Sequence, residues 1–277
     1  MSLLGVVLVF LSAFLHAGWN FISKKCHSSA AFFLFMSISN AILWSWALWA
    51  YSDLWTGLSW KFWLLWGASS LAECIYCVGL ARAYRVMDIS VVYPMARALP
   101  VLMLAVITPL LGMGHIPGWQ GMIGLITVSI GCFFIPLARF ADFNWRNFTN
   151  PAMRFIFQAA AGTAGYTIEE GCPDYPWLKV SLFYIGFVET GLALSLAITV
   201  FTQKKEIAAL KQLIAQRSFF PVLAGLCSST AYLLILIAMN YFTQLGFLQA
   251  FRQLSLPMGV LAGIIYLKER CSAPQWL

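Results

Sequence analysis

Several ionisable side chains fall inside long apolar segments of the chain, and four of them could form a binding or proton-transfer site. They are His16, Glu73, Arg97 and Arg252, and each occupies a different segment of about 20 mostly apolar residues. A charged group in the hydrocarbon core of a membrane is costly, so such residues usually face a cavity or a partner. We therefore interpret these four as candidates for substrate binding or proton transfer.

The two arginines stand a few residues before prolines, Arg97 before Pro100 and Arg252 before Pro257. Proline frees a carbonyl in the preceding turn and can bend or open a helix. A guanidinium beside such a break suits an anionic group, such as a carboxylate, a phosphate or a phosphonate. The alternative is an arginine that extends its charged end to the membrane interface. Two arginines in matching segments favour a binding site, and we add their neighbours Tyr93 and Gln249 to it.

Glu73 shares one helical face with several polar residues. Ser69, Ser70, Tyr76 and Cys77 lie three or four positions away from it. A buried carboxylate that exchanges a proton with water can couple transport to a proton gradient, so Glu73 is a proton-coupling candidate. A structural hydrogen bond or an ion pair with an arginine is an equally good explanation, and both stay open here.

A second stripe of polar and aromatic residues follows the first apolar segment. Trp19 and Asn20 lie near His16 on one face, and Tyr166 takes the matching place in the second half of the chain. These residues are predicted to line a substrate cavity, and His16 is a further proton-coupling candidate because imidazole titrates near neutral pH. The competing explanation is helix packing around Gly18, a residue small enough to let helices approach closely. Glu189 is a second acid within an apolar segment and a weaker candidate than Glu73.

The composition places these residues in a membrane protein. Of 277 residues, 61% are hydrophobic and only 10% are charged, and the chain contains 12 Trp and 22 Phe. A soluble domain carries about 25% charged residues. Aromatic residues in such numbers suit lipid-facing surfaces and membrane interfaces. The formal charge of +7 therefore does not indicate a nucleic-acid partner.

The hydropathy pattern predicts an all-α integral membrane protein with nine spans. Their predicted ranges are 3–22, 31–51, 62–83, 91–111, 118–137, 152–168, 178–202, 219–242 and 245–267. A polar stretch at 138–150 divides the chain into two halves, and a second polar stretch, 203–218, is predicted as a loop.

The two halves repeat one another. A shift of 157 residues brings Pro100 onto Pro257 and Trp119 onto Trp276. Repeats with an odd number of spans are inverted with respect to each other, as in many secondary transporters. We therefore predict a five-helix repeat over 1–137 and a second over 151–277. The second lacks about 17 residues of an expected tenth helix, which we interpret as truncation.

Basic residues are distributed unevenly between the loops. Loops after odd-numbered spans hold thirteen Lys and Arg, whereas loops after even-numbered spans hold two, Lys61 and Lys179. The positive-inside rule then places the odd-numbered loops in the cytoplasm and Met1 outside.

No enzyme or nucleotide-binding motif occurs in the chain. It lacks a P-loop, an H-E-x-x-H motif and a G-x-S-x-G motif, and it has three His. Cys74 and Cys77 form a C-x-x-C pattern without a second pair, which favours helix packing over metal binding. We expect no catalytic activity, no cofactor and no bound metal.

Three short motifs resemble the EamA family of the drug/metabolite transporter superfamily. They are His16-Ala17-Gly18-Trp19-Asn20, the segment Tyr93–Pro100 with Arg97, and Leu267-Lys268-Glu269-Arg270. The resemblance implies ten helices in two inverted halves, and export or uptake of small metabolites without ATP hydrolysis. The first motif is also similar to a branch of the family associated with phosphonate utilisation.

The sequence thus predicts a multi-pass secondary transporter of the inner cell membrane. It would move a small anionic or zwitterionic metabolite by alternating access, with a proton as coupling ion and a central cavity lined by spans 1, 3, 4, 6, 8 and 9. Two alternatives stay open: an exporter of amino acids or cationic drug-like compounds with Glu73 binding the cation, and a non-transporting membrane assembly partner. The lipid bilayer is the expected surroundings, and a homodimer is left open.

Overall fold

The computed structural model describes residues 3–26, 29–110, 119, 123–124, 127, 153–158, 177–238, 241 and 252–269, and the regular elements in these ranges are helices. Five of them are long and apolar enough to cross a membrane: α1 (Leu3–Lys25), α2 (Ala30–Ala50), α3 (Trp60–Val86), α8 (Trp177–Phe201) and α10 (Phe220–Ala238). The other elements are η1 (Ser52–Gly57), α4 (Ile89–Leu110), α9 (Lys204–Ala215) and α12 (Ser255–Leu267). The chain is therefore a multi-pass membrane protein, as its hydropathy predicted.

The outer surface of the helices is apolar. Large side chains such as Leu3, Trp49, Ile198 and Tyr266 are exposed on it. A water-soluble monomer rarely exposes so much apolar surface. These faces therefore suit contact with lipid.

Most predicted spans coincide with described helices to within a few residues. The spans predicted at 118–137 and 152–168 lie almost entirely outside the described residues, and so does the boundary at 138–150. Tyr166 and Gln249 lie outside them as well.

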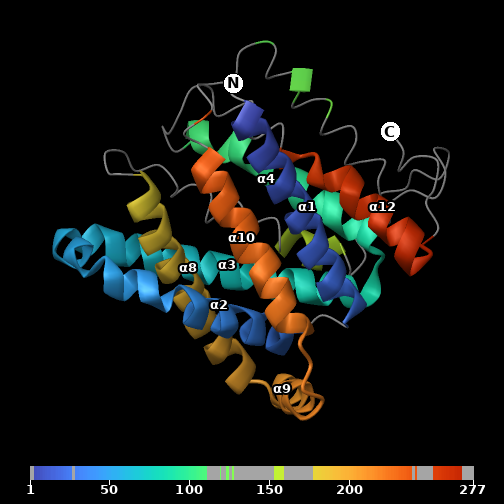
Figure 1. Ribbon diagram of the computed structural model, residues 1–277. Helices are drawn as coiled ribbons and strands as arrows, with labels where there is room; N and C mark the ends of the chain where they lie inside the picture. Colours follow the sequence, from blue (N-terminus) through green and yellow to red (C-terminus); the bar gives the residue numbers. More distant parts are fainter. Residues whose placement is uncertain are drawn as a thin grey trace.

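Two helix pairs connect the N-terminal and C-terminal parts of the chain. Helix α1 runs beside α10 in the opposite direction, and α2 packs along α8 (Figure 1). The hydroxyl of Ser12 donates a hydrogen bond of 2.7 Å to the carbonyl of Ala231, which fixes α1 against α10. Helix α8 also packs on α3, where the indole Nε1 of Trp66 donates to the carbonyl of Phe187 at 2.8 Å.

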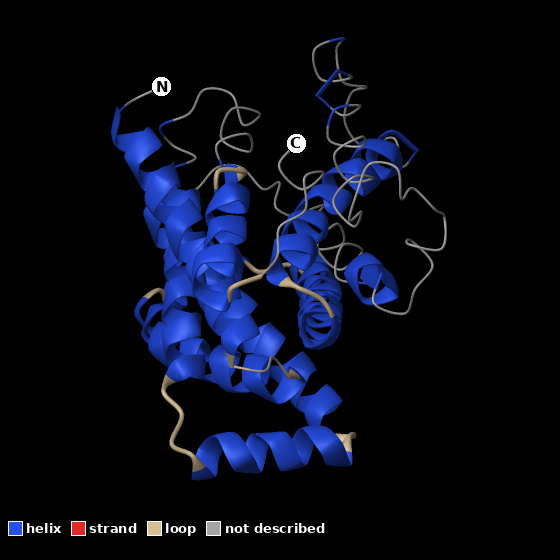
Figure 2. Ribbon diagram, turned by 90° about the vertical axis from the view of Figure 1, so that its right-hand side faces the viewer, coloured by secondary structure: helices blue, strands red, loops and turns tan. Residues whose placement is uncertain are grey.

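The basic helix ends meet at one end of the bundle. Lys24 donates hydrogen bonds to the carbonyls of Tyr84 (2.8 Å) and Met87 (2.5 Å), so the C-terminal ends of α1 and α3 lie together. Arg85 of α3 forms an ion pair of 3.1 Å with Glu206 of α9. Helix α9 lies across this end of the bundle (Figure 2).

The other end of the bundle carries fewer charged side chains among the described residues. There Lys179, at the start of α8, donates a hydrogen bond of 2.5 Å to Oδ2 of Asp53 in η1. This bond lowers the pKa of the Asp53 carboxyl. Among the described residues, the segments that follow α1, α3 and α8 thus lie at one end of the bundle, and η1 and the start of α8 lie at the other.

The loop predicted at 203–218 was wrong, because most of this segment forms helix α9. Leu210 and Leu213, three positions apart, pack against the core, while Lys204 and Lys211 are exposed. Apolar residues at helical spacing in a charged segment produce an amphipathic helix rather than a loop.

The continuous span predicted at 245–267 was also wrong in its described part. A turn at Gln253 and Leu254 interrupts the helix, and α12 begins at Ser255. Pro257 then lies in the first turn of α12, where its missing N–H has no intrahelical partner to lose. By contrast, α4 stays helical through its own prolines, Pro94, Pro100 and Pro109.

We expect Lys205 to face the cytoplasm and Asp53 to face the outside, because basic loops are retained in the cytoplasm. In single-cysteine variants, a membrane-impermeant thiol reagent added to intact cells should label Asp53→Cys and leave Lys205→Cys unlabelled. Labelling of Lys205→Cys but not of Asp53→Cys would show that the protein has the opposite orientation in the membrane.

We expect Glu206→Ala to destabilise the bundle by about 1–3 kcal/mol, the usual cost of leaving a buried partner unsatisfied. Glu206 is buried and accepts hydrogen bonds from the backbone N–H of Ala31 and from Arg85, each at 3.1 Å. Glu206→Gln keeps an acceptor and should lose less. Thermal unfolding in detergent measures both, and an unchanged melting temperature for Glu206→Ala would show that this contact is unimportant.

Candidate functional site

A small cavity of about 80 Å³ lies between α1, α2, α3, α8 and α10. Four of the predicted site residues line it, namely His16, Trp19, Glu73 and Arg252. The sequence had placed these residues in three separate segments. The fold therefore brings both acidic and basic candidates to one cavity.

His16 is at the centre of the basic side of this site. Its ring meets Trp19 edge-on, with ring centroids 5.2 Å apart, and stacks near Tyr93 of α4 at 6.3 Å. Arg97 and Arg252 lie close enough to His16 to act on it electrostatically. Five of the predicted residues thus form one cluster.

Several polar atoms of this cluster are buried and make no hydrogen bond within the described part of the chain. They are Nε2 of His16, Nε1 of Trp19, the hydroxyl of Tyr93 and Nε of Arg97. Buried polar groups in proteins are nearly always hydrogen-bonded, so each exception calls for an explanation. Indole and guanidinium N–H groups act only as donors. An unfilled set of donors beside a second arginine is suited to receive an anionic group.

Asn20 is used differently from its neighbours. Its amide donates a hydrogen bond to the carbonyl of His16 (2.8 Å) and accepts one from the Tyr84 hydroxyl (2.7 Å). It is fully buried and does not line the cavity. In this structure Asn20 ties α1 to α3 and so positions His16.

Tyr93 is positioned by two contacts between α4 and the α12 region, one at the start of α4 and one at the tyrosine ring. Glu269, just after α12, accepts hydrogen bonds from the first backbone N–H groups of α4, those of Ile89 (2.9 Å) and Ser90 (3.0 Å). These donors have no partner within the helix, so the carboxylate caps α4. Further along α12, Gly259 leaves room for the Tyr93 ring, which lies against its Cα.

The opposite side of the cavity is acidic. Glu73 of α3 and Glu189 of α8 both line it. Glu189 is only 6% exposed, and the amide of Asn40 lies beside it without a hydrogen bond of normal geometry. The two acids therefore line the same small cavity as His16, Trp19 and Arg252.

The contribution of α8 was missed from the sequence, because the segment 178–202 was not among the predicted cavity walls. Tyr184, Val188 and Leu192 are spaced by four residues and, with Glu189, form its cavity face. Tyr232 comes from α10 in a similar way. The sequence did contain a signal for this face, because Glu189 lies next to residues spaced by four that include Tyr184. Glu73 was found from a similar pattern, an acid with Tyr76 on the same helical face.

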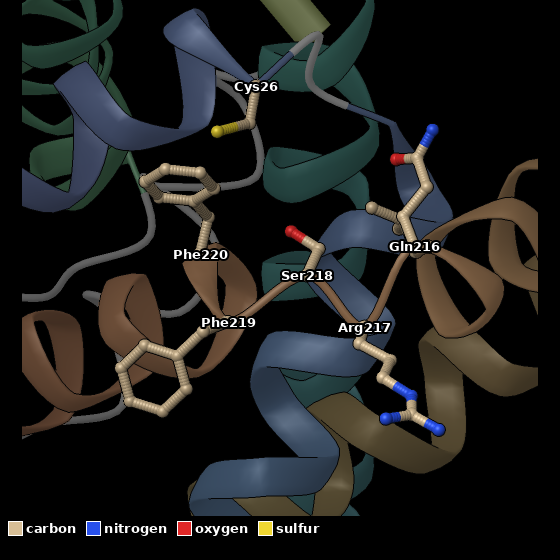
Figure 3. A pocket seen from close by; sticks show the side chains of 7 residues that line it. Cys26, Gln216, Arg217, Ser218, Phe219 and Phe220 are labelled. Atoms are coloured by element: carbon tan, nitrogen blue, oxygen red, sulfur yellow. The ribbon is translucent and has the colours of Figure 1, made fainter.

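A larger hollow of about 450 Å³ lies elsewhere, where the end of α9 meets the start of α10. Its only charged lining residue is Arg217, whose side chain extends away from Cys26 and Phe220 (Figure 3). None of the predicted site residues lines it. We therefore assign the candidate site to the smaller, charged cavity.

The cysteines of α3 belong to the core. Cys74 and Cys77 are buried free thiols, and Sγ of Cys74 lies 3.4 Å from the hydroxyl of Thr199 in α8. Within the described ranges, no group of three or more His, Cys, Asp or Glu side chains is arranged to hold a metal ion. The two thiols pack helices together in this structure.

Comparison of the chain with protein-family models, with curated proteins and with solved structures found no match. The functional argument therefore rests on the residues and their geometry.

Proposed function

We propose that the chain is a secondary transporter of a small anionic or zwitterionic metabolite, of the inner cell membrane and of the EamA type. The observation that carries the proposal is the set of buried, unfilled donors around His16, beside Arg252. Structural polar groups would be satisfied by each other, as Asn20 and Tyr84 are. His16 and Trp19 of this set line the membrane-embedded cavity, and unfilled donors at a cavity wall are what an anion-binding site needs before its ligand arrives.

The size of the cavity supports a site that alternates between conformations. Pockets for small molecules usually have volumes of roughly 300–1,000 Å³. The cavity here has about 80 Å³, enough for a few water molecules. A metabolite could enter only if the helices moved apart, as in alternating access by two inverted halves.

The substrate class is best tested by thermal unfolding of the purified protein with a panel of small compounds. The panel contains acetate, methylphosphonate, inorganic phosphate, glycine and tetraethylammonium. A ligand present at 100 times its dissociation constant stabilises the folded state by about 2.7 kcal/mol. We expect stabilisation by at least one anion or zwitterion and none by tetraethylammonium.

The acidic side of the cavity favours a second candidate, an exporter of amino acids or of organic cations. Glu73 and Glu189 would then hold the cationic group. Stabilisation by tetraethylammonium that is lost in Glu73→Gln would support this candidate. Stabilisation by glycine but not by acetate would show that both sides of the cavity bind substrate.

A further inference from the structure

Glu189 is the most deeply placed acid of the cavity. It lies in the middle of α8, it is 6% exposed, and its helix is enclosed by α2, α3 and α10. Among the described residues no Lys or Arg forms an ion pair with it. An ionised carboxylate at this depth would be costly, so the closed cavity stabilises the neutral acid.

The groups around Glu189 offer little compensation for a negative charge. Helix α2 contributes the neutral amide of Asn40. The other titratable or charged side chains that line the same cavity are His16, Glu73, Tyr76, Cys77, Tyr184, Tyr232 and Arg252. The other acid that lines the cavity, Glu73, opposes a second negative charge, because two carboxylates in one small volume repel each other.

We propose that Glu189 is the proton-binding site of the transport cycle, protonated while the cavity is closed and released to water when the cavity opens. This proposal rests on the proposed function. Opening hydrates the carboxyl group and allows it to ionise, with the proton passing to water at the open side. Ionised Glu189 would repel an anion near Arg252, so a bound proton and a bound anion favour each other. The coupling is therefore proton symport with an anionic substrate.

Infrared difference spectroscopy tests the protonation directly and needs no substrate. In lipid at neutral pH, the C=O stretching band of a buried protonated carboxylic acid should be present in the wild-type protein. It should be lost in Glu189→Gln and kept in the matched control Glu73→Gln. A band that disappears in Glu73→Gln and persists in Glu189→Gln would overturn the assignment.

Opening of the cavity is followed through Cys77, which is buried and lines it. In variants that retain Cys77 as their only cysteine, the rate of modification by a methanethiosulfonate reagent reports opening. When the buffer is changed from acidic to alkaline, the modification rate should rise several-fold more in the variant that retains Glu189 than in the variant that carries Glu189→Gln. A negative charge on Glu189 opposes formation of the Cys77 thiolate in the same cavity and so slows its modification, which means that a faster rate with Glu189 reports opening of the cavity.

Equal rates in the two variants would overturn the role of Glu189 in opening, and a rate controlled by Na⁺ instead of pH would show a cation site. Both readouts are separate from the proposed function. If no ligand binds but the infrared band is lost only in Glu189→Gln, the proposed transport function is refuted and the protonation of Glu189 stands. If a ligand from the panel binds but the wild-type protein shows no such infrared band, only the assignment of Glu189 as the proton-binding site is refuted.

Discussion

Arg252→Gln should weaken binding of an anionic ligand by about 2–5 kcal/mol, or roughly 30- to 4,000-fold in the dissociation constant. Arg252 lines the cavity, and both Arg252 and Arg97 interact electrostatically with His16. An anion held between the two guanidinium groups would lose a charged partner in a water-poor site. Titration with the anion that stabilises the protein measures the effect, and Arg97→Gln should show the same direction.

The matched control is Arg217→Gln, because Arg217 is exposed at the far end of α9 and lies outside the cavity. The affinity of Arg217→Gln for the anion should equal that of the wild-type protein. Melting temperatures identify a variant that fails only because it unfolds, and Arg252→Lys retains the charge in a folded site. Wild-type affinity in folded Arg252→Gln would show that this arginine does not contact the ligand.

Gly191→Ala should destabilise the bundle by about 1–3 kcal/mol, the usual cost of overpacking a dense interior. A Cβ atom at Gly191 would overlap Oγ of Ser70 and come within 2.8 Å of Nε1 of Trp66. Both side chains are held by hydrogen bonds, Ser70 to the carbonyl of Trp66 and Trp66 to that of Phe187. Neither can move away without breaking one of these bonds.

The control for this substitution is Gly67→Ala in α3, where an added Cβ meets no atom within 4 Å. Alanine has the higher helix propensity, so this change should be neutral or slightly stabilising. Thermal unfolding in detergent compares the two variants. Equal melting temperatures would mean that α3 and α8 pack less closely than in this structure.

The sequence predicted most of the described membrane-spanning helices well, because a span is recognised from its length and hydropathy alone. It failed at α9, where apolar residues every three or four positions were masked by Lys and Gln. It also failed to locate the close-packed glycines. Gly18 was proposed as a packing residue, yet an added Cβ there meets nothing in the described structure, whereas Gly191 and Gly259 face α3 and Tyr93.

The candidate site was predictable only in part. Charges inside apolar segments pointed to His16, Arg97 and Arg252, because burial of charge is visible in the pattern itself. The proximity of Glu189 to that cluster depends on how α8 packs against α2 and α3, and no local pattern encodes it. Asn20 looked like a cavity residue, but its two hydrogen bonds give it a positioning role that depends on Tyr84, 64 positions away.

Transport by the purified protein in liposomes tests the central claim most directly. Vesicles are loaded with unlabelled compound, and uptake of the labelled compound from the panel is followed by counterflow. We predict accumulation of at least one small anion or zwitterion in wild-type vesicles, and loss of that accumulation in vesicles containing Arg252→Gln. Uptake no faster than in protein-free vesicles for every compound, from a protein that is folded and inserted, would contradict a transport function.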